Sequence, residues 1–416
     1  MEYKYNLGIV GAGPAGYTAA LHAAKKGLSV VMFEKDCIGG ICLNRGCIPT
    51  KSILHCAEFY KELKCAQSLG IVIPDFTYDF AKVVERKNQI VQKLRKSLEL
   101  AVKNSKITMI KAKADVINTN TISTTDDCYR CDKIIIASGS QSVALPGIEF
   151  DHKRILNSDD VLDLQYLPES IAIIGSGAIG IEWARIFSAF DVDVTVIEMA
   201  ENLLPVADIE VSKRIERIFK ANGIKFYKST KVEDIQCNEK CLLRYSSGNV
   251  TEVDKVLVAI GRKPVPYRKI DGVTYLGDIC GEIQLAHYAI KQAIAEIDGI
   301  HFDKSLVRSV VYGNPEIAWI GKREQDLEKG SYKKSMLLIS ALGKSQCDNA
   351  VDGFIKILSQ DGIIVGAHIV SKEASSLIQQ VSIAMQNNVT VEKLKEVCFA
   401  HPTYSEGIFE SLFNLE

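Results

Sequence analysis

Two cysteines, Cys42 and Cys47, stand five positions apart in a short segment between Gly39 and Lys51. Glycines and a proline around them favour tight turns, so a helix can begin there and its free amides can favour a thiolate. Most cysteines in a reduced compartment simply pack as small apolar side chains, and the chain has 12 of them. Because this pair follows a glycine-rich nucleotide motif, we predict that it carries disulfide chemistry instead.

A histidine near the C-terminus is the candidate proton acceptor. His401 belongs to the run Phe399 to Glu406, and an imidazole near neutral pKa suits proton exchange with a dithiol. A carboxylate from Glu406 on its second nitrogen would fix the tautomer and raise the basicity of the ring. Thr403 and Glu406 also have the spacing of a capping box, so Glu406 could instead serve only to start the last helix.

The first glycine motif lies between an apolar segment, predicted to be a buried strand, and an alanine-rich helical stretch. Its glycines are Gly11, Gly13 and Gly16. In such a motif the first glycine makes the turn, the second lets a pyrophosphate approach and the third packs the helix on the sheet. Glu34 ends the next strand, where a ribose hydroxyl would bind.

The same construction returns 164 positions later, with Gly175, Gly177, Gly180 and an acid at Glu198. One such motif alone could be only a tight loop between a strand and a helix. Two motifs with the same number of residues between the first glycine and the glutamate predict two dinucleotide-binding domains. Two nucleotides bound together indicate electron or hydride transfer. Glu198 would repel a 2′-phosphate, and no arginine follows it closely, which favours NAD over NADP. The alternative is that Glu198 is a solvated acid at a strand end.

Two further apolar strands end on glycines, Gly139 and Gly261, and are expected to return to the two sheets. Either could also be an ordinary buried parallel strand. Asp278 follows a glycine, where a carboxylate could reach a sugar or ribityl hydroxyl; the plain alternative is a turn aspartate.

Composition limits the classes of function. With 416 residues the chain should form two to four domains, and its net charge of −1 points to neither nucleic acid nor an acidic membrane. The N-terminus lacks the pattern of a signal peptide, which predicts a cytoplasmic chain or a mature organellar one.

Cys128 and Cys131 form a CxxC without further metal ligands nearby, so we expect no metal site and regard them, like Cys237 and Cys241, as incidental.

Together these segments resemble the class I pyridine nucleotide-disulfide oxidoreductases over essentially the whole chain, and most closely those acting on dihydrolipoyl groups. The resemblance implies FAD at the first glycine motif and NAD at the second. It implies that Cys42 exchanges with substrate and that Cys47 contacts the flavin. It also implies that Lys51, near the flavin, pairs with Glu182, although both could be solvated helix charges.

The resemblance implies an α/β fold with two Rossmann-like dinucleotide-binding domains and a C-terminal α+β dimerisation domain. The expected domains are an FAD domain with the redox disulfide (1–143), an NAD domain (144–268), a central segment returning to the FAD domain (269–304) and an interface domain (305–416). In the family, residues 265–276 correspond to a longer segment, so its shortening either loosens this junction or opens the flavin edge to solvent. The family's histidine reaches the disulfide of the opposite subunit, which implies a homodimer.

The implied reaction is oxidation of dihydrolipoyl groups on a carrier protein with reduction of NAD⁺. The carrier would be the E2 component of a 2-oxoacid dehydrogenase or the H protein of a glycine cleavage system. Two alternatives stay open: another NAD(P)H-dependent disulfide reductase of the superfamily, or a flavoprotein that is mainly an interaction subunit.

Overall fold

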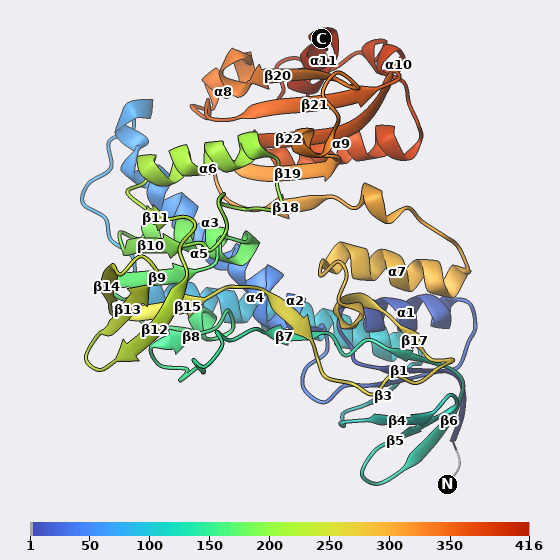
Figure 1. Cartoon of the computed structure of the whole chain (residues 1–416). Coiled ribbons are helices and arrows are strands. Elements are labelled where there is room, and N and C mark those ends of the chain that lie inside the picture. Colours follow the sequence, from blue (N-terminus) through green and yellow to red (C-terminus); the bar gives the residue numbers. More distant parts are fainter. Residues whose placement is uncertain (1–2, 416) are drawn as a thin grey trace.

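A computed structural model describes residues 3–415, so the outermost residues of the predicted first and last domains lie outside the description. The described residues form five sheets, and the three largest organise the chain (Figure 1). In the view of Figure 1 the first lies at the lower right, the second at the left, and the third, formed by the last part of the chain, at the top.

The first sheet has a parallel core in the order β3-β2-β1-β6, and antiparallel β5 and β4 extend it. β2 is buried at every position, as expected for a parallel strand covered on both faces. After the second sheet is complete, β17 pairs in parallel with the end of β6, so the chain returns to the first sheet. Its strands are β1 (Tyr3–Val10), β2 (Val30–Phe33), β3 (Thr108–Ile110), β4 (Asp115–Asn118), β5 (Thr121–Ser123), β6 (Cys128–Ile136) and β17 (Thr274–Tyr275).

The helices around the first sheet include a pair from distant parts of the chain, α1 and α7, which lie side by side (Figure 1). α1 starts directly after Gly13 with a proline at its first position, where the missing N–H costs no helical hydrogen bond. The Asp79 carboxylate caps α4 by accepting from the backbone amide of Lys82. These helices are α1 (Pro14–Lys25), α2 (Gly40–Arg45), α3 (Cys47–Lys64), α4 (Phe80–Asn104) and α7 (Ala286–Asp298).

The second sheet is parallel throughout, in the order β11-β10-β9-β15-β8. An antiparallel sheet, β12-β13-β14, packs beside it, and the two short strands β7 and β16 pair where the chain passes between the first two sheets. The elements are β7 (Ser140–Ser142), β8 (Ile155–Leu156), β9 (Ser170–Ile174), α5 (Ala178–Ala189), β10 (Asp193–Ile197), α6 (Ile209–Ala221), β11 (Lys225–Tyr227), β12 (Val232–Cys237), β13 (Cys241–Tyr245), β14 (Val250–Val253), β15 (Lys255–Val258) and β16 (Arg262–Pro264).

The third sheet is antiparallel, in the order β18-β19-β22-β21-β20, and α9 and α11 pack against it. The sequence pattern predicts a strand pair over 354–358 and 363–370 and an amphipathic helix over 374–386, and the structure has them as β21, β22 and α9. The elements are β18 (Ser309–Val311), β19 (Glu316–Gly321), β20 (Lys333–Leu338), α8 (Gly343–Cys347), β21 (Phe354–Gln360), β22 (Ile363–Ser371), α9 (Ala374–Gln386), α10 (Val391–Lys395) and α11 (Glu406–Phe413). Short 3₁₀ turns are η1 (Ala66–Leu69), η2 (Asp160–Asp163), η3 (Gly277–Cys280), η4 (Lys304–Leu306), η5 (Glu324–Asp326) and η6 (Ile339–Ala341).

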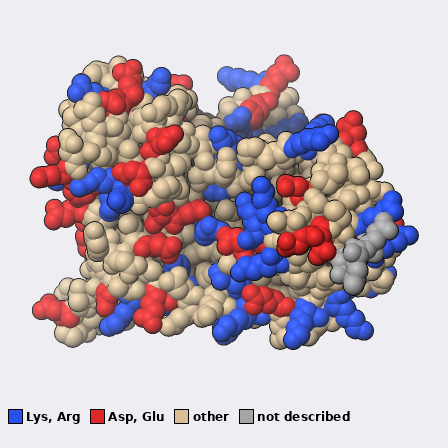
Figure 2. Space-filling model, turned by 90° about the horizontal axis from the view of Figure 1, so that it is seen from below, with Lys and Arg blue, Asp and Glu red and all other residues tan. Residues whose placement is uncertain are grey.

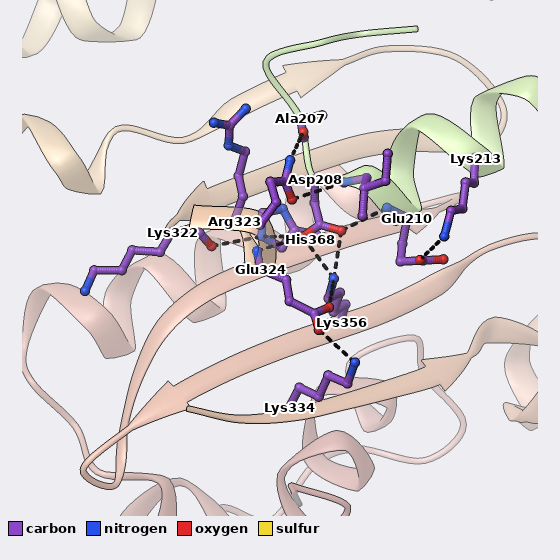
Figure 3. Close-up of polar contacts among 12 residues, drawn as sticks. Ala207, Asp208, Glu210, Lys213, Lys322, Arg323, Glu324, Lys334, Lys356 and His368 are labelled. Atoms are coloured by element: carbon purple, nitrogen blue, oxygen red, sulfur yellow. Dashed lines mark hydrogen bonds and ion pairs between the residues drawn. The ribbon is translucent and has the colours of Figure 1, made fainter. Parts of the chain in front are cut away.

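A buried ionic cluster joins the second and third sheets (Figure 3). Asp208, the N-cap of α6, is fully buried and accepts from Nζ of Lys356 on β21 at 2.8 and 2.9 Å. Lys356 also pairs with Glu324 at 2.5 Å, and His368 on β22 lies 3.9 Å from Asp208. Burial opposes ionisation of Glu324, but hydrogen bonds from Lys334 and Lys356 hold its pKa at about 2. The α6 terminus is therefore fixed to the third sheet by charge pairing inside the protein.

Positive and negative side chains are interspersed on the face shown in Figure 2. Mixed charge of this kind gives no broad field of one sign for a polyanion. Within residues 3–415, helices long and apolar enough to span a membrane are absent.

The cysteines outside the predicted pair differ in one respect from expectation. Cys128 and Cys131 are both free thiols on β6. Cys237 and Cys241 form a disulfide, so their description as incidental was wrong. The two cysteines end β12 and begin β13, and they face each other in the register of that hairpin, which sequence spacing alone did not reveal.

We expect Lys356→Met to lower the free energy of unfolding by about 3–5 kcal/mol, because it leaves the buried Asp208 carboxylate without its main partner. Lys334→Met is the matched control: Lys334 pairs with the same Glu324 but is 56% exposed, so we expect a loss of about 0–1 kcal/mol. Urea unfolding of the two variants measures the difference. Equal losses would show that burial of the cluster contributes nothing.

Candidate active site

The turn that leads into the helices of the two cysteines packs directly on the first glycine motif. Gly39 and Gly40 both have positive φ, at 96° and 58°, and the amide of Gly39 donates to the carbonyl of Ala12 at 2.8 Å. A Cβ atom on Gly40 would lie 2.6 Å from Cα of Gly13. Glycine is therefore required where the two loops touch, and this contact sets Cys42 beside the motif.

Cys42 lies in α2, and Cys47 is the first residue of α3; both are free thiols and partly buried. A hydrogen bond between the two side chains raises the pKa of Cys42 far above its usual range, and burial adds to the rise. The same bond lowers the pKa of Cys47 to about 7, against burial and with help from the Lys51 ammonium. Cys47 is therefore the thiolate of the pair and Cys42 the thiol.

Lys51, one turn after Cys47 on α3, reaches across to α5. Its Nζ lies 2.9 and 2.7 Å from the two carboxylate oxygens of Glu182, which is buried. Glu182 also accepts from the backbone amide of Tyr312 at 3.0 Å, and the Tyr312 ring lies 4.6 Å from Lys51 Nζ. The contact predicted between Lys51 and Glu182 is present and joins all three regions of the chain.

Two residues near the cysteines were missed in the sequence. Asn44 donates to the carbonyls of Ile38 and Gly40, and its own oxygen accepts from Nε of Arg95 on α4 at 2.9 Å. These hydrogen bonds hold α2 in place. Burial raises the pKa of the Tyr17 hydroxyl, and the nearby sulfurs of Cys42 and Cys47 raise it further. The position of Tyr17 directly after Gly16 is the signal in the sequence that points to it.

The three glycines of each motif meet three different surroundings. The first, Gly11 or Gly175, has φ near 100°, and a Cβ there would strike the carbonyl of Ala137 or Ala259. The third glycine faces the carbonyl of the first: a Cβ on Gly16 would lie 1.8 Å from it, and one on Gly180 2.0 Å. The second glycines differ, because a Cβ on Gly177 meets nothing within 4 Å, and one on Gly13 meets only Cα of Gly40, at 3.8 Å. Space above the second glycine is what a bound pyrophosphate requires.

The two glutamates at the strand ends have matching geometry. Glu34 accepts from the amides of Ala12 and Asp36 at 2.8 and 2.9 Å. Glu198 accepts from the amide of Ser176 at 2.8 Å and from that of Ala200 at 2.7 Å. Oε2 of Glu198 also accepts from the Ser176 hydroxyl at 2.7 Å. A lone pair for a ribose hydroxyl therefore remains on Oε1 of Glu198 and on both oxygens of Glu34, so the acceptors of both sites fit a dinucleotide.

Gly139 and Gly261 follow the last strand of each sheet with φ of 78° and 116°, and a Cβ on either would meet open space. Asp278 lies in η3, where it accepts from the Ser140 hydroxyl at 2.6 Å. The adjacent Gly277 packs on Ala15 of α1. Asp278 is thereby brought to the glycine motif of the first sheet, from which it is far in sequence.

His401 and Glu406 form the expected contact. Nδ1 of His401 lies 2.8 Å from Oε1 of Glu406, while Oε2 accepts from the amide of Thr403 at 2.8 Å. The second bond is half of a capping box, but the helix N-cap is Ser405 and the Thr403 hydroxyl donates to Ala400 instead. The hydrogen bond from Thr403, and then that from His401, lower the pKa of Glu406.

The structure does not bring His401 to the cysteines of the same chain. The ring is 76% exposed, and Figure 1 shows α11 at the far end of the molecule from α2, with the third sheet between them. Within residues 3–415, clusters of three or more His, Cys, Asp or Glu side chains suited to a metal are absent.

Two dinucleotide folds with a dithiol against the first define a flavin- and pyridine nucleotide-dependent disulfide oxidoreductase. Family models agree: the pyridine nucleotide-disulphide oxidoreductase model matches residues 5–275, and its dimerisation-domain model matches 307–412. The chain belongs to the pyridine nucleotide-disulfide oxidoreductase family. It is an NAD-dependent flavoprotein oxidoreductase with FAD and NAD as cofactors, and its dimerisation domain supports a homodimer.

Relatives of this chain include dihydrolipoyl dehydrogenases. That of Chlamydia pneumoniae is 33% identical over 442 residues, covering 98% of this chain and 96% of the relative. One from Bacillus subtilis is 32% identical over 449 residues, with 98% of each chain covered. Both alignments are longer than the 416-residue chain, so these relatives carry insertions that it lacks.

Solved structures share the fold. Mycobacterium tuberculosis LpdA has a TM-score of 0.91 at 23% identity, with 99% of both chains covered. The HOCl-induced flavoprotein disulfide reductase RclA of Escherichia coli has a TM-score of 0.86 at 25% identity, again with 99% of both chains covered.

Gly180→Ala and Gly177→Ala make a matched test of the second glycine motif. The first places a Cβ against the Gly175 carbonyl, and we expect it to cost about 1–3 kcal/mol of folding free energy. The second should leave stability unchanged and weaken NADH binding, because its methyl group enters the open space. Thermal unfolding and fluorescence titration with NADH measure both. Unchanged NADH affinity in Gly177→Ala would contradict the assignment of the space above Gly177 to the pyrophosphate of the nucleotide.

The thiolate of Cys47 should titrate near neutrality. If the Cys47 thiolate lies against the flavin, the two-electron-reduced enzyme should show a long-wavelength absorption band from thiolate-to-flavin charge transfer. We expect this band to be present above about pH 7 and to fade below it, because Cys47 then takes up a proton. Lys51→Met should move the midpoint upward because a stabilising positive charge is lost. Lys64→Met, at the far end of α3, is the control. If Lys51→Met leaves the midpoint of the Cys47 titration unchanged, the Lys51 charge does not stabilise the thiolate.

Proposed function

We propose that this enzyme oxidises dihydrolipoyl groups on a carrier protein to the disulfide and reduces NAD⁺ to NADH. The observation that carries the proposal is the Cys42–Cys47 dithiol, with its thiolate at the start of α3, set against the first glycine motif. The likeness to dihydrolipoyl dehydrogenases over almost the whole chain supports the substrate class.

The proposed cofactor sites follow the glycine motifs. When bound, FAD accepts the electron pair of the dithiol and passes it to the nicotinamide as hydride. FAD would be held by Gly11, Gly13, Gly16, Glu34, Gly139 and Asp278, with Lys51 and Glu182 beside it. NAD would be held by Gly175, Gly177, Gly180, Glu198 and Gly261. The regions around the three sheets would then be the FAD, NAD and interface domains, with boundaries near residues 143, 268 and 304.

In the proposed reaction the two cysteines begin as a disulfide. A lipoyl thiolate attacks Sγ of Cys42, the Cys42–Cys47 bond breaks, and Cys47 leaves as the thiolate. The second lipoyl thiolate then attacks the lipoyl sulfur of the mixed disulfide, which releases the lipoyl disulfide and leaves Cys42 reduced. Cys47 is suited to be the leaving group because its pKa is the lower of the two.

His401 would accept the protons of the substrate thiols through Nε2, the nitrogen that does not face Glu406. Glu406 holds the other nitrogen, and so would fix the tautomer and support the charge that forms on the ring. Because the two cysteines lie far from this ring in one chain, the dyad would act on the dithiol of the second copy in the homodimer.

The carrier would be the E2 component of a 2-oxoacid dehydrogenase or the H protein of a glycine cleavage system. The cytoplasmic setting predicted from the sequence stays a prediction. The function is tested by NAD⁺ reduction with free dihydrolipoamide, compared with NADP⁺ as acceptor and with oxidised glutathione plus NADPH. Preference for glutathione and NADPH would favour another disulfide reductase, and a protein without bound flavin would favour the interaction-subunit alternative.

Cys42→Ser should abolish lipoamide turnover, and His401→Ala should slow it about 10²–10⁴-fold while the flavin stays bound. Hybrid dimers of these two variants separate action within a chain from action across the dimer. Each hybrid pairs one intact dithiol with one intact His401 from the other copy, so we expect activity to return in part. Hybrids as inactive as both parents would contradict action across the dimer.

A further inference from the structure

The two glycine motifs hold their glutamates in the same way, but the chain then differs between them. Each glutamate accepts from an amide of its motif and from the amide two residues after the glutamate. Those second amides belong to Asp36 in the first site and to Ala200 in the second. The Asp36 carboxylate pairs with the guanidinium of Arg45, whereas an alanine can form no ion pair. The first site therefore has a charged contact that the second cannot form at the corresponding position.

The ion pair connects the two ends of segment 36–45. Arg45 is the last residue of α2, and Asp36 lies just before the turn that leads into this helix. The two side chains are 47% and 46% exposed, so the pair lies at the outer surface of the segment. On the inside, Asn44 donates to the carbonyls of Ile38 and Gly40. The segment is thus closed on itself from both sides.

Segment 36–45 borders the first nucleotide site. Near its start, the amide of Asp36 donates to Oε1 of Glu34, the carboxylate that would hold the ribose. Further along, Gly40 is the wall that faces the open space above Gly13, where the pyrophosphate would lie. Movement of the segment away from the motif would therefore uncover both the ribose and the pyrophosphate positions.

Arg45 also supports the charge of the ribose-binding glutamate. Burial raises the pKa of Glu34, while the hydrogen bond from the Ala12 amide and the positive charges of Lys35 and Arg45 oppose the rise. An ionised carboxylate is a stronger acceptor for a hydroxyl than a protonated one. The same arginine that closes the segment therefore helps Glu34 to hold a ribose.

We propose that Arg45 and Asp36 form a clasp that retains FAD in the first site, by holding segment 36–45 closed against the ribose and the pyrophosphate. Both are positioning residues, because they act through the segment and through Glu34. The second site, with Ala200, cannot form this ion pair, which suits a nucleotide that must leave after each turnover. The proposal rests on the assignment of FAD to the first motif and of NAD to the second.

The test measures how fast FAD leaves the flavin-loaded dimer, by ultrafiltration and assay of the released flavin over time. We expect Arg45→Met and Asp36→Asn each to raise the release rate about twofold to fivefold, the range for an exposed ion pair. The double variant should release FAD no faster than the faster single variant, because both changes remove one interaction. Arg323→Met is the matched control: Arg323 also pairs with an aspartate, Asp326, at similar exposure, and should leave the rate unchanged.

Exchange of the two charges, by Arg45→Asp together with Asp36→Arg, should restore slow release in large part. Unchanged release in both single variants, effects that add in the double variant, or an exchanged pair as fast as the single variants would each overturn the clasp. So would release that Arg45→Met speeds and Asp36→Asn does not, because Arg45 would then act on the phosphates directly.

Glu34→Gln separates the clasp from the assignment of the two motifs. It should speed FAD release and leave the affinity for NADH unchanged. If Glu34→Gln weakens NADH binding and leaves FAD release unchanged, FAD does not occupy the first motif, and both the assignment and the clasp are wrong. If it speeds FAD release while the clasp variants do not, the assignment stands and only the clasp is wrong.

Discussion

The ion pair between Lys51 and Glu182 is the interaction on which the arrangement of the active site depends. It joins the helix that starts at Cys47, one turn after that cysteine, to the helix of the second glycine motif. Tyr312 adds the third region through its backbone amide. A salt bridge this buried adds little net stability by itself. Its importance is positional, because it fixes where the thiolate lies relative to both nucleotide folds.

The parts of the molecule that sequence predicted well depend on local spacing. Each glycine motif needs its first glycine for a turn and its third for a close helix contact, and both needs are visible within a few residues. The helix over Ala374–Gln386 follows from its periodicity in the same way. These features do not require knowledge of what packs against them.

The features that sequence missed are formed by segments far apart in the chain. Arg95 reaches Asn44 across 51 positions, and Lys356 reaches Asp208 across 148. In the sequence each is one charged residue among many, with nothing to mark it as buried. The Cys237–Cys241 pair is local, but only the register of the hairpin shows that the two sulfurs face each other.

The contact between Gly40 and Gly13 has a consequence for how this kind of site can change. The loop that would cradle the phosphates and the turn that leads into the helices bearing the reactive sulfurs are in direct contact, with no side chain between their backbones. Neither loop can be lengthened or tilted without displacing the other. Substrate range in such an enzyme can therefore be altered through the surfaces that approach the sulfurs, while the sulfurs themselves stay in one place.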